Sequence, residues 1–291
     1  MSKANTTFGG KGLYGALIVL LRHVNVKVLY SFMAVFIIPV TMLLSPGARL
    51  TYRYYHRKRG YGIWKSVLST YRNHCVFGQT VIDKFAMYAG HSFRINLVGF
   101  DEYLVQTSCD KSILQLNAHV GCSEILGYSC HVNKPCNVLV YGGEKESLMA
   151  YRRSSFGDMN IKMIPVGTGE NNSEAIAGAL DNGEIVCAFA DRFFNDKKIV
   201  RSTLHGHPIR LARGPFSLAV TRGIDVVMAS AMKEKDGAYT AFFTPLHYDK
   251  SLPSKQQRQQ LADAYMAEVE RILEKYPMQW FNYFNPWAEN A

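Results

Sequence analysis

An alternation of apolar and polar residues predicts a strand over residues 112–119, "SILQLNAH", which ends at His119. Apolar runs that stop at glycine or at a charged residue predict further strands. Helices are predicted where capping residues flank a segment, as in "SKQQ" at 254–257. The predicted strands are 136–143, 161–167, 184–191, 225–233 and 238–246, and the predicted helices are 171–183, 213–223 and 254 to about 276.

Strands that alternate with helices are typical of an α/β layer fold. We therefore expect a mainly parallel central sheet flanked by helices, with an N-terminal membrane helix before it. In such sheets, functional sites form at the carboxyl ends of the strands. His119 and Asp191 both stand at such ends.

The segment from residue 28 to residue 48, "VLYSFMAVFIIPVTMLLSPGA", contains no charged residue. As a helix it measures roughly 31 Å, which is enough to cross a bilayer. Pro39 would kink this helix, which membrane helices tolerate. The alternative is a soluble protein that buries one very apolar helix.

Basic residues follow the apolar segment in "RLTYRYYHRKRG" (49–60), which favours the cytoplasmic side of a membrane. Lys3, Lys11, Arg22 and Lys27 on the other flank weaken this orientation. We expect a membrane anchor with its basic segment over residues 1–60 and an α/β catalytic domain over residues 61–291.

The 291-residue chain is 48% hydrophobic and 19% charged, with a formal net charge of +10. The positive charge favours anionic partners, namely nucleic acid, a membrane surface or an acidic carrier protein. Zinc-finger spacing and RNA-binding motifs are absent from the sequence, so we expect no nucleic acid partner. The six cysteines lack CxxC spacing and are expected to be free thiols in a reducing compartment.

His119 and Glu124 are five positions apart in "HVGCSE", which corresponds to about 140° on a helix. They can meet only if His119 lies in a turn before a helix that starts near Gly121 or Ser123. Two interpretations remain open on spacing alone. The pair either holds a loop or supplies a catalytic base and its orienting acid.

"HVGCSE" resembles the HxxxxE signature of the lysophospholipid acyltransferase superfamily, in the form used by its lipid A biosynthesis acyltransferase branch. "GEIVCAFADR", "RSTLHGHPIRLARGPFSLA" and "PMQWFNYFNPW" are similar to further blocks of that branch and follow in the same order. The resemblance extends from about residue 12 to residue 287. Cys122, Ser123, His205 and His207 depart from the usual residues of these blocks and leave the acceptor open.

The resemblance implies acyl transfer from an acyl carrier protein or coenzyme A thioester to a hydroxyl or amine of a lipid-like acceptor. It implies that His119 is the general base and that Glu124 orients it. Backbone N–H groups around Gly214 or Arg152 would stabilise the oxyanion. We expect no cofactor and no metal. The implied location is the bacterial inner membrane, with the catalytic domain on the cytoplasmic side.

Substrate binding is predicted for residues that match the family's blocks, although each has a simpler interpretation. Arg152 and Arg153 fit a solvated basic turn equally well, Asp191 and Arg192 fit an ion pair at a strand end, and Arg201 fits an exposed surface position. The predicted substrate-binding set is Arg152, Arg153, Asp191, Arg192, Arg201 and Gly214.

Two other functions remain as alternatives. One is a catalytically inactive lipid-binding relative, and the other is a metal-dependent hydrolase that uses His205 and His207 together with His119 and Glu124. The aromatic segment 280–287 is expected to close the core, to lie at a membrane interface or to line an acyl tunnel.

Overall fold

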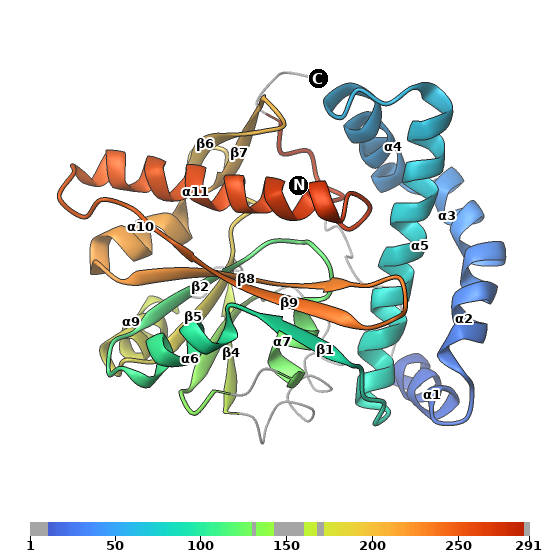
Figure 1. The fold of residues 1–291 in the computed structure, drawn as a ribbon, viewed down its shortest axis with the longest axis horizontal. Coiled ribbons are helices and arrows are strands. Elements are labelled where there is room, and N and C mark those ends of the chain that lie inside the picture. The colour runs from blue at the N-terminus through green and yellow to red at the C-terminus, as the bar shows by residue number, and fades with distance from the viewer. Residues whose placement is uncertain (1–10, 130–131, 143–159, 168–171, 288–291) are drawn as a thin grey trace.

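A seven-stranded sheet in the order β1-β9-β8-β2-β5-β3-β4 lies at the centre of the chain (Figure 1). This computed structural model describes residues 11–129, 132–142, 160–167 and 172–287. Neighbouring strands are parallel except for β8 and β9, which form an antiparallel pair. The predicted mainly parallel sheet is confirmed. The strands are β1 (Ile95–Val98), β2 (Ile113–Asn117), β3 (Cys136–Tyr141), β4 (Ile161–Val166), β5 (Ile185–Phe189), β8 (Asp225–Lys233) and β9 (Tyr239–Leu246).

Strand β2 is buried along its whole length, although its alternating sequence resembles that of a strand with one face in solvent. Its polar residues are satisfied inside the protein. Gln115 accepts a hydrogen bond from the Tyr103 hydroxyl at 2.8 Å, and Asn117 donates to the carbonyl of Ala229 at 2.9 Å. Alternation here therefore marks internal hydrogen bonds and not exposure.

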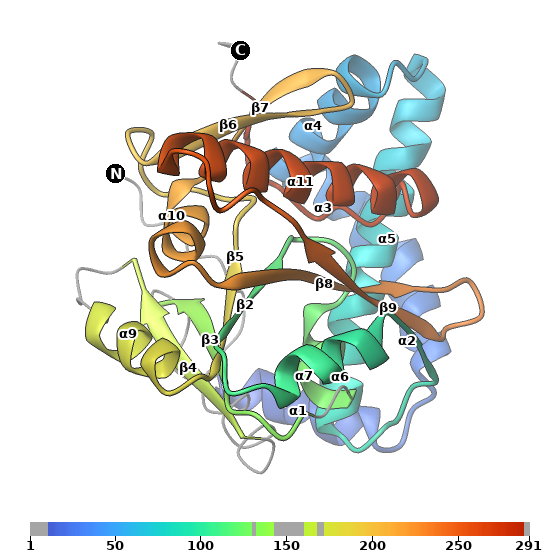
Figure 2. The ribbon, with the colours of Figure 1, turned by 60° about the vertical axis from the view of Figure 1, so that its left-hand side comes forward.

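Helices cover both faces of the sheet, with α10 and α11 above it and α6 and α7 below it in Figure 2. One apolar core joins the first face to residues such as Leu261 and Tyr265 of α11. A second core joins the other face to Tyr103 of α6 and Ile125 of α7. The helices are α6 (Phe100–Ser108), α7 (Ser123–Ser129), α9 (Ser173–Asp181), α10 (Arg213–Arg222) and α11 (Ser254–Lys275).

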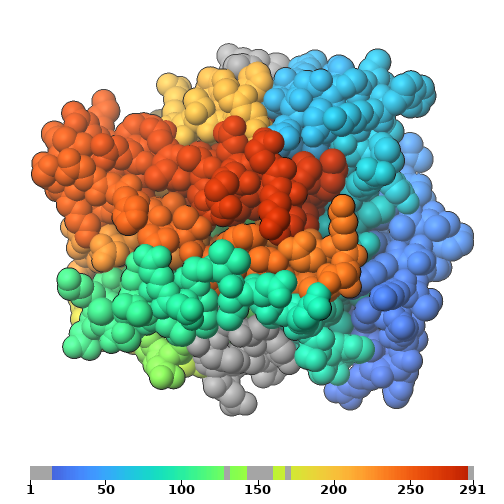
Figure 3. Space-filling model, in the orientation of Figure 1, coloured from blue at the N-terminus to red at the C-terminus, as the bar shows by residue number. Residues whose placement is uncertain are grey.

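The N-terminal helices form a separate layer at one side of the molecule, drawn in blue to cyan in Figures 1 and 3. The long helix α5 packs against α1, α2, α3 and α4. The predicted domain division after residue 60 stays a prediction, and the layer built on α5 continues past that point. Its members are α1 (Lys11–Leu21), α2 (Val26–Phe32), the π-helical turn η1 (Met33–Ile37), α3 (Ile38–Leu44), α4 (Pro46–Arg53), the π-helical turn η2 (Tyr54–Lys58) and α5 (Ile63–Tyr88).

One helical stretch, Val26–Leu44, is long and apolar enough to cross a membrane, and only 11% of it is buried. It therefore does not fit the alternative of a buried core helix. Pro39 lies in the first turn of α3, directly after η1. A π-helical turn there adjusts the backbone to a proline, which cannot donate a hydrogen bond.

A small two-stranded sheet, β6 (Ile199–Leu204) and β7 (His207–Ala212), packs beside α11. A two-residue turn joins these strands, with φ of +52° at His205 and +75° at Gly206. Positive φ at both positions is typical of the hairpin turns whose twist matches that of the strands.

Candidate active site

His119 and Asp191 lie side by side because β2 and β5 are paired in parallel. The register places Asn117 opposite Phe189, so the residues two positions beyond each strand end are neighbours. The His119 Nδ1 and Asp191 Oδ1 atoms are 2.6 Å apart, and the backbone N–H of His119 donates to Asp191 Oδ2 at 2.9 Å. The Asp191 carboxylate thus accepts two hydrogen bonds from His119, one from its ring and one from its backbone.

Asp191 is buried, with 1% of its side chain exposed, whereas the His119 side chain is 28% exposed. Burial raises the pKa of Asp191, but the His119 charge, the hydrogen bonds from His119 and the nearby Arg192 charge outweigh it. The net result is a pKa below the ordinary value. An ionised Asp191 accepts a hydrogen bond from the Nδ1–H of His119, so the lone pair of this imidazole tautomer is on Nε2.

A turn at Gly121 leads from the histidine into α7. Gly121 has a φ of +56°, and a Cβ at this position would collide with the carbonyl oxygen of Ala231. Only glycine fits both the backbone angle and the space. The predicted strand, turn and helix around His119 are therefore present.

Glu124 lies in the first turn of α7, and its Oε1 atom is 2.5 Å from Lys84 Nζ on α5. Both side chains are largely buried, at 13% exposed for Lys84 and 18% for Glu124. The acid bonded to His119 Nδ1 is Asp191, which we had predicted to bind substrate. The prediction that Glu124 orients His119 stays a prediction.

The C-terminal segment 279–283 packs against the turn that carries His119. The Phe281 N–H donates to the His119 carbonyl at 2.7 Å, and the Gly121 N–H donates to the Gln279 carbonyl at 3.0 Å. The Trp280 indole N–H lies 3.4 Å from Asp191 Oδ2. Trp280 and Phe281 are both buried, so this part of the aromatic segment belongs to the core.

Arg192 follows Asp191 directly in the chain but turns toward the C-terminal segment. Its guanidinium donates to Asn282 Oδ1 at 3.0 Å and to the Phe281 carbonyl at 2.9 Å. Burial lowers the pKa of Arg192, against the attraction of Asp191. Arg192 therefore ties the strand end to the segment that carries Trp280.

The start of α10 also lies next to the strand end. The Ala212 N–H, just before α10, donates to the Ala190 carbonyl at 3.0 Å. Gly214 is an exposed residue in the first turn of this helix. The Arg213 N–H donates to the Lys198 carbonyl at 3.1 Å, and Pro215 has no N–H. The Gly214 N–H is therefore the candidate oxyanion donor at this helix start.

The remaining predicted residues are not brought to His119 by any contact in the described part of the chain. Arg201 is exposed on β6, and its carbonyl accepts a hydrogen bond from Gln259. Arg152 and Arg153 lie outside the described residues. Their predicted roles in substrate binding stay predictions.

His205, Glu270 and Glu274 place three possible metal ligands within 4.8 Å of one another. The Arg59 guanidinium lies among them, 3.1 Å from both ring nitrogens of His205 and 2.5 Å from Glu274. The Arg59 charge offsets that of the Glu274 carboxylate, which a metal ion would need as a ligand. The acids beside His205 are Glu270 and Glu274 of α11. The metal-hydrolase alternative instead combined His205 with Glu124.

Sequence reasoning missed Lys84 and Trp280 as neighbours of the motif. Lys84 lies in a long helix, and nothing in the local sequence indicates that its partner is Glu124, 40 positions away. The adjacent Asp83 is likewise buried against Lys233 of β8. A basic residue on the buried side of a helix was the available signal, because such residues are normally paired.

The model of the bacterial lipid A biosynthesis acyltransferase family matches residues 109–288, which is more than half of the chain. The chain therefore belongs to that family, as the resemblance of its motifs predicts. It is an acyltransferase of lipid biosynthesis, and its reaction requires an acyl donor and a lipid acceptor.

Among solved structures, the chain is similar to that of the 1-acyl-sn-glycerophosphate (LPA) acyltransferase PlsC from Thermotoga maritima. The identity is 14% and the TM-score is 0.39, over 93% of this chain and 99% of that chain. No curated protein sequence matches the chain.

Proposed function

We propose that this acyltransferase moves a fatty acyl group from a thioester of acyl carrier protein or coenzyme A to a hydroxyl or amine of a lipid-like acceptor. The observation that supports this proposal is the His119–Asp191 pair at the carboxyl ends of β2 and β5. A neutral acceptor hydroxyl is a poor nucleophile and needs a base. A partly exposed histidine held by a buried carboxylate is suited to that task.

In the proposed reaction, His119 Nε2 removes the acceptor proton as the acceptor oxygen or nitrogen attacks the thioester carbonyl. Asp191 stabilises the imidazolium that forms. The backbone N–H of Gly214, in the first turn of α10, binds the oxyanion. The tetrahedral intermediate collapses, the carbon–sulfur bond breaks, and the thiolate takes the proton from Nε2. The proton and charge balance without a cofactor.

Glu124 remains in this proposal as the second acid of the motif. Its ion pair with Lys84 fixes the first turn of α7, which begins four residues after His119. In this position it either orients His119 or holds the helix that shapes the acceptor site. The two roles predict different rates of acyl transfer for the Glu124→Gln variant.

We propose further that the protein is bound to a membrane and that the helix Val26–Leu44 lies in the interface without crossing the bilayer. The argument rests on contacts along this helix. The Tyr30 hydroxyl bonds to buried Asp83, and the Ala34 carbonyl accepts a bond from Tyr71 on α5 at 3.1 Å. Lys233 of the central sheet lies 3.3 Å from the same Tyr30 hydroxyl. A crossing helix would have to break these bonds or draw polar parts of α5 into hydrocarbon.

The apolar side chains that face away from α5 would enter the membrane. They include Phe36, which is 62% exposed, and Leu43, which is 80% exposed. The basic segment after α3 favours the cytoplasmic face of a bacterial inner membrane. We propose that residues 1–60 make this attachment and that residues 61–291 carry the catalysis.

Acyl transfer by purified protein tests the proposed function. Labelled acyl carrier protein and labelled acyl-CoA are each supplied with a membrane lipid extract, and the acylated lipid is identified by mass spectrometry. We expect His119→Ala to lower the rate by about 10²- to 10⁴-fold. His247→Ala is the matched control, because His247 is exposed and lies outside the site. Near wild-type transfer by the His119→Ala protein would exclude His119 as the base.

A further inference from the structure

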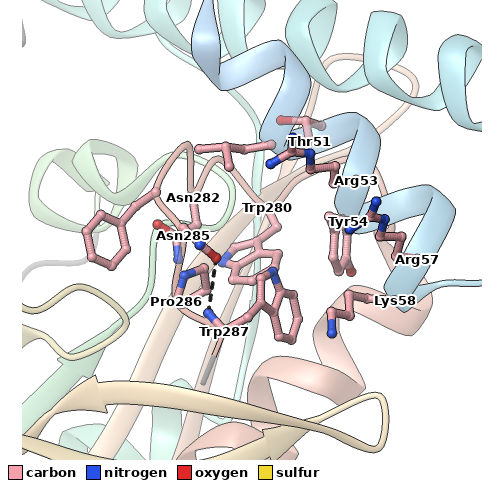
Figure 4. Close-up of a pocket in the computed structure, with 12 residues that line it drawn as sticks. Thr51, Arg53, Tyr54, Arg57, Lys58, Trp280, Asn282, Asn285, Pro286 and Trp287 are labelled. Atoms are coloured by element: carbon pink, nitrogen blue, oxygen red, sulfur yellow. Dashed lines mark hydrogen bonds between the residues drawn. The ribbon is translucent and has the colours of Figure 1, made fainter. Parts of the chain in front are cut away.

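Arg53 and Arg57 each line two hollows, one on either side of the helical stretch formed by α4 and η2. The inner hollow has a volume of about 110 Å³ and separates this stretch from the C-terminal segment (Figure 4). The outer hollow has a volume of about 380 Å³ and lies between α3, α4, η2 and α5. The same two arginines therefore belong to the walls of both hollows.

These two arginines are exposed and carry uncompensated charge. No carboxylate lines either hollow, and none pairs with Arg53 or Arg57 within the described part of the chain. Arg59, a few residues on, is neutralised by Glu274. Arg49 and His56 add to the basic lining of the outer hollow. Guanidinium groups bind phosphate with two parallel hydrogen bonds, so the pair is suited to a phosphoryl group.

The outer hollow opens beside the apolar surface of the N-terminal layer. Met42 and Val67 are part of its lining, and their neighbours Leu44 and Trp64 are 78% and 86% exposed. A ligand with both a phosphoryl group and hydrocarbon would contact the basic and the apolar surface at once. A soluble phosphate compound would leave the apolar surface exposed to water.

Two residues that line the inner hollow, Trp280 and Asn282, also contact Asp191. Trp280 forms part of the wall of this hollow, together with Tyr54 and Trp287, and the Trp280 indole N–H lies 3.4 Å from Asp191 Oδ2. Lys58 lies over the Trp287 ring, 5.0 Å from its centroid. A headgroup held by Arg53 and Arg57 would thus lie close to the site of acyl transfer.

We propose that Arg53 and Arg57 bind the phosphoryl headgroup of an anionic lipid, whose hydrocarbon chains lie over α3 and the start of α5. The proposal rests on the membrane association proposed above. The lipid is either the acyl acceptor itself or a membrane phospholipid that is not acylated. Both sources share the same chemistry, a phosphate on a lipid, and the experiment separates them.

Vesicle sedimentation with the full-length protein tests this site. The probes are vesicles of phosphatidylcholine alone and of phosphatidylcholine with phosphatidic acid. We expect the double variant Arg53→Gln/Arg57→Gln to bind the anionic vesicles about 10- to 30-fold more weakly, because each surface cation contributes about fivefold. Binding to neutral vesicles should be unchanged.

The matched control is Lys255→Gln/Arg258→Gln, which removes two cations from the start of α11. In Figure 1 this end of α11 lies on the opposite side of the molecule from α4. Since exposed charges are screened beyond about 8–10 Å, we expect at most a twofold effect from this pair, roughly. Equal losses in both double variants would assign the binding to net charge and overturn the site. Displacement from the vesicles by coenzyme A or inorganic phosphate would also overturn it, in favour of a soluble phosphate.

Kinetics in neutral detergent then identify the lipid. If the acceptor occupies the site, Arg53→Gln/Arg57→Gln raises the KM for a phosphorylated acceptor. If a membrane phospholipid occupies it, this KM is unchanged while vesicle binding falls. His119→Ala should bind vesicles like the wild type. If the arginine variant binds vesicles normally and transfer still depends on His119, the lipid site is refuted and the proposed function stands. If vesicle binding depends on the two arginines but no acyl transfer is detected, the proposed function is refuted and the lipid site stands.

Discussion

At the scale of single residues, the position of His119 depends on a carboxylate that is 72 positions away in the chain. Asp191 is fully buried, and its pKa is lowered mainly through the charge and bonds of His119 against the effect of burial. An ionised, buried acid with two hydrogen bonds to one histidine fixes both the tautomer and the direction of the ring. Glu124 has Lys84 as a partner and sits on a separate element.

The two acids can be distinguished by isosteric substitution. We expect Asp191→Asn to lower kcat by about 10²- to 10⁴-fold with little change in KM, because the amide favours the wrong tautomer of His119. Glu124→Gln should lower kcat less. Steady-state kinetics check both, and unfolding curves confirm that the variants are folded. A larger loss for Glu124→Gln than for Asp191→Asn would return the orienting role to Glu124.

Gly121 gives a second prediction at this scale. Gly121→Ala should destabilise the protein by about 1–3 kcal/mol from backbone strain, and further through the collision with the Ala231 carbonyl. Gly237→Ala is the control, because Gly237 also has positive φ, +91°, but has open space around it. Denaturant unfolding of both variants measures the difference. Equal destabilisation would mean that the close approach at Gly121 has no energetic weight.

At the scale of elements, the helix Val26–Leu44 is attached to α5 on one side and exposes apolar side chains on the other. Gly78 on α5 shows how close the packing is, since a Cβ there would collide with Met33. The helix is therefore part of the folded protein as well as a candidate membrane contact. The surface packed against α5 requires side chains of the right shape, whereas the exposed surface requires only apolar side chains.

Polar substitutions on the outer surface of this helix should weaken membrane binding without unfolding the protein. We expect Phe36→Ser/Leu43→Ser to lower partitioning into neutral vesicles by about tenfold or more, since each buried large apolar side chain contributes about 1.5–3 kcal/mol. Val105→Ser on α6 is the control, because Val105 is 67% exposed but lies outside the N-terminal layer. Vesicle flotation provides the measurement, and unaltered flotation of the double variant would exclude this surface from the membrane.

At the scale of the whole molecule, the net charge of +10 has more than one possible use. Arg53 and Arg57 belong to the proposed lipid site. Lys197, Lys198 and Arg201 are exposed on the turn after β5 and on β6, a few residues beyond Asp191. We propose that this second group docks an acidic acyl carrier protein.

Charge reversal in the second group tests the donor. Lys197→Glu/Lys198→Glu/Arg201→Glu should raise the KM for acyl carrier protein in neutral detergent by about tenfold at low salt, with a smaller change in kcat. The effect should fade as salt is added. Transfer from acyl-CoA is the internal control. A KM for the carrier that does not respond to these changes would favour coenzyme A as the donor.

The sequence by itself determined six strands of the central sheet and the helices α9, α10 and α11, but not β1, α6 or the β6–β7 hairpin. It also determined the turn after His119, the placement of His119 and Asp191 at strand ends, and the apolar and basic character of the N-terminal region. These features depend on local patterns of side chains along the chain. The motif blocks also identified the family, because they follow one another along the chain in the same order as in the family.

Only the tertiary structure decided which acid meets His119, because that depends on β2 and β5 being neighbours in the sheet, with β3 and β4 between them in the sequence. It also decided that the apolar helix lies along α5 and that Arg53, Arg57 and Trp280 line the same hollow. Residues more than 200 positions apart meet there. Contacts of this kind result from the packing of the whole chain, which local hydrophobic patterns do not specify.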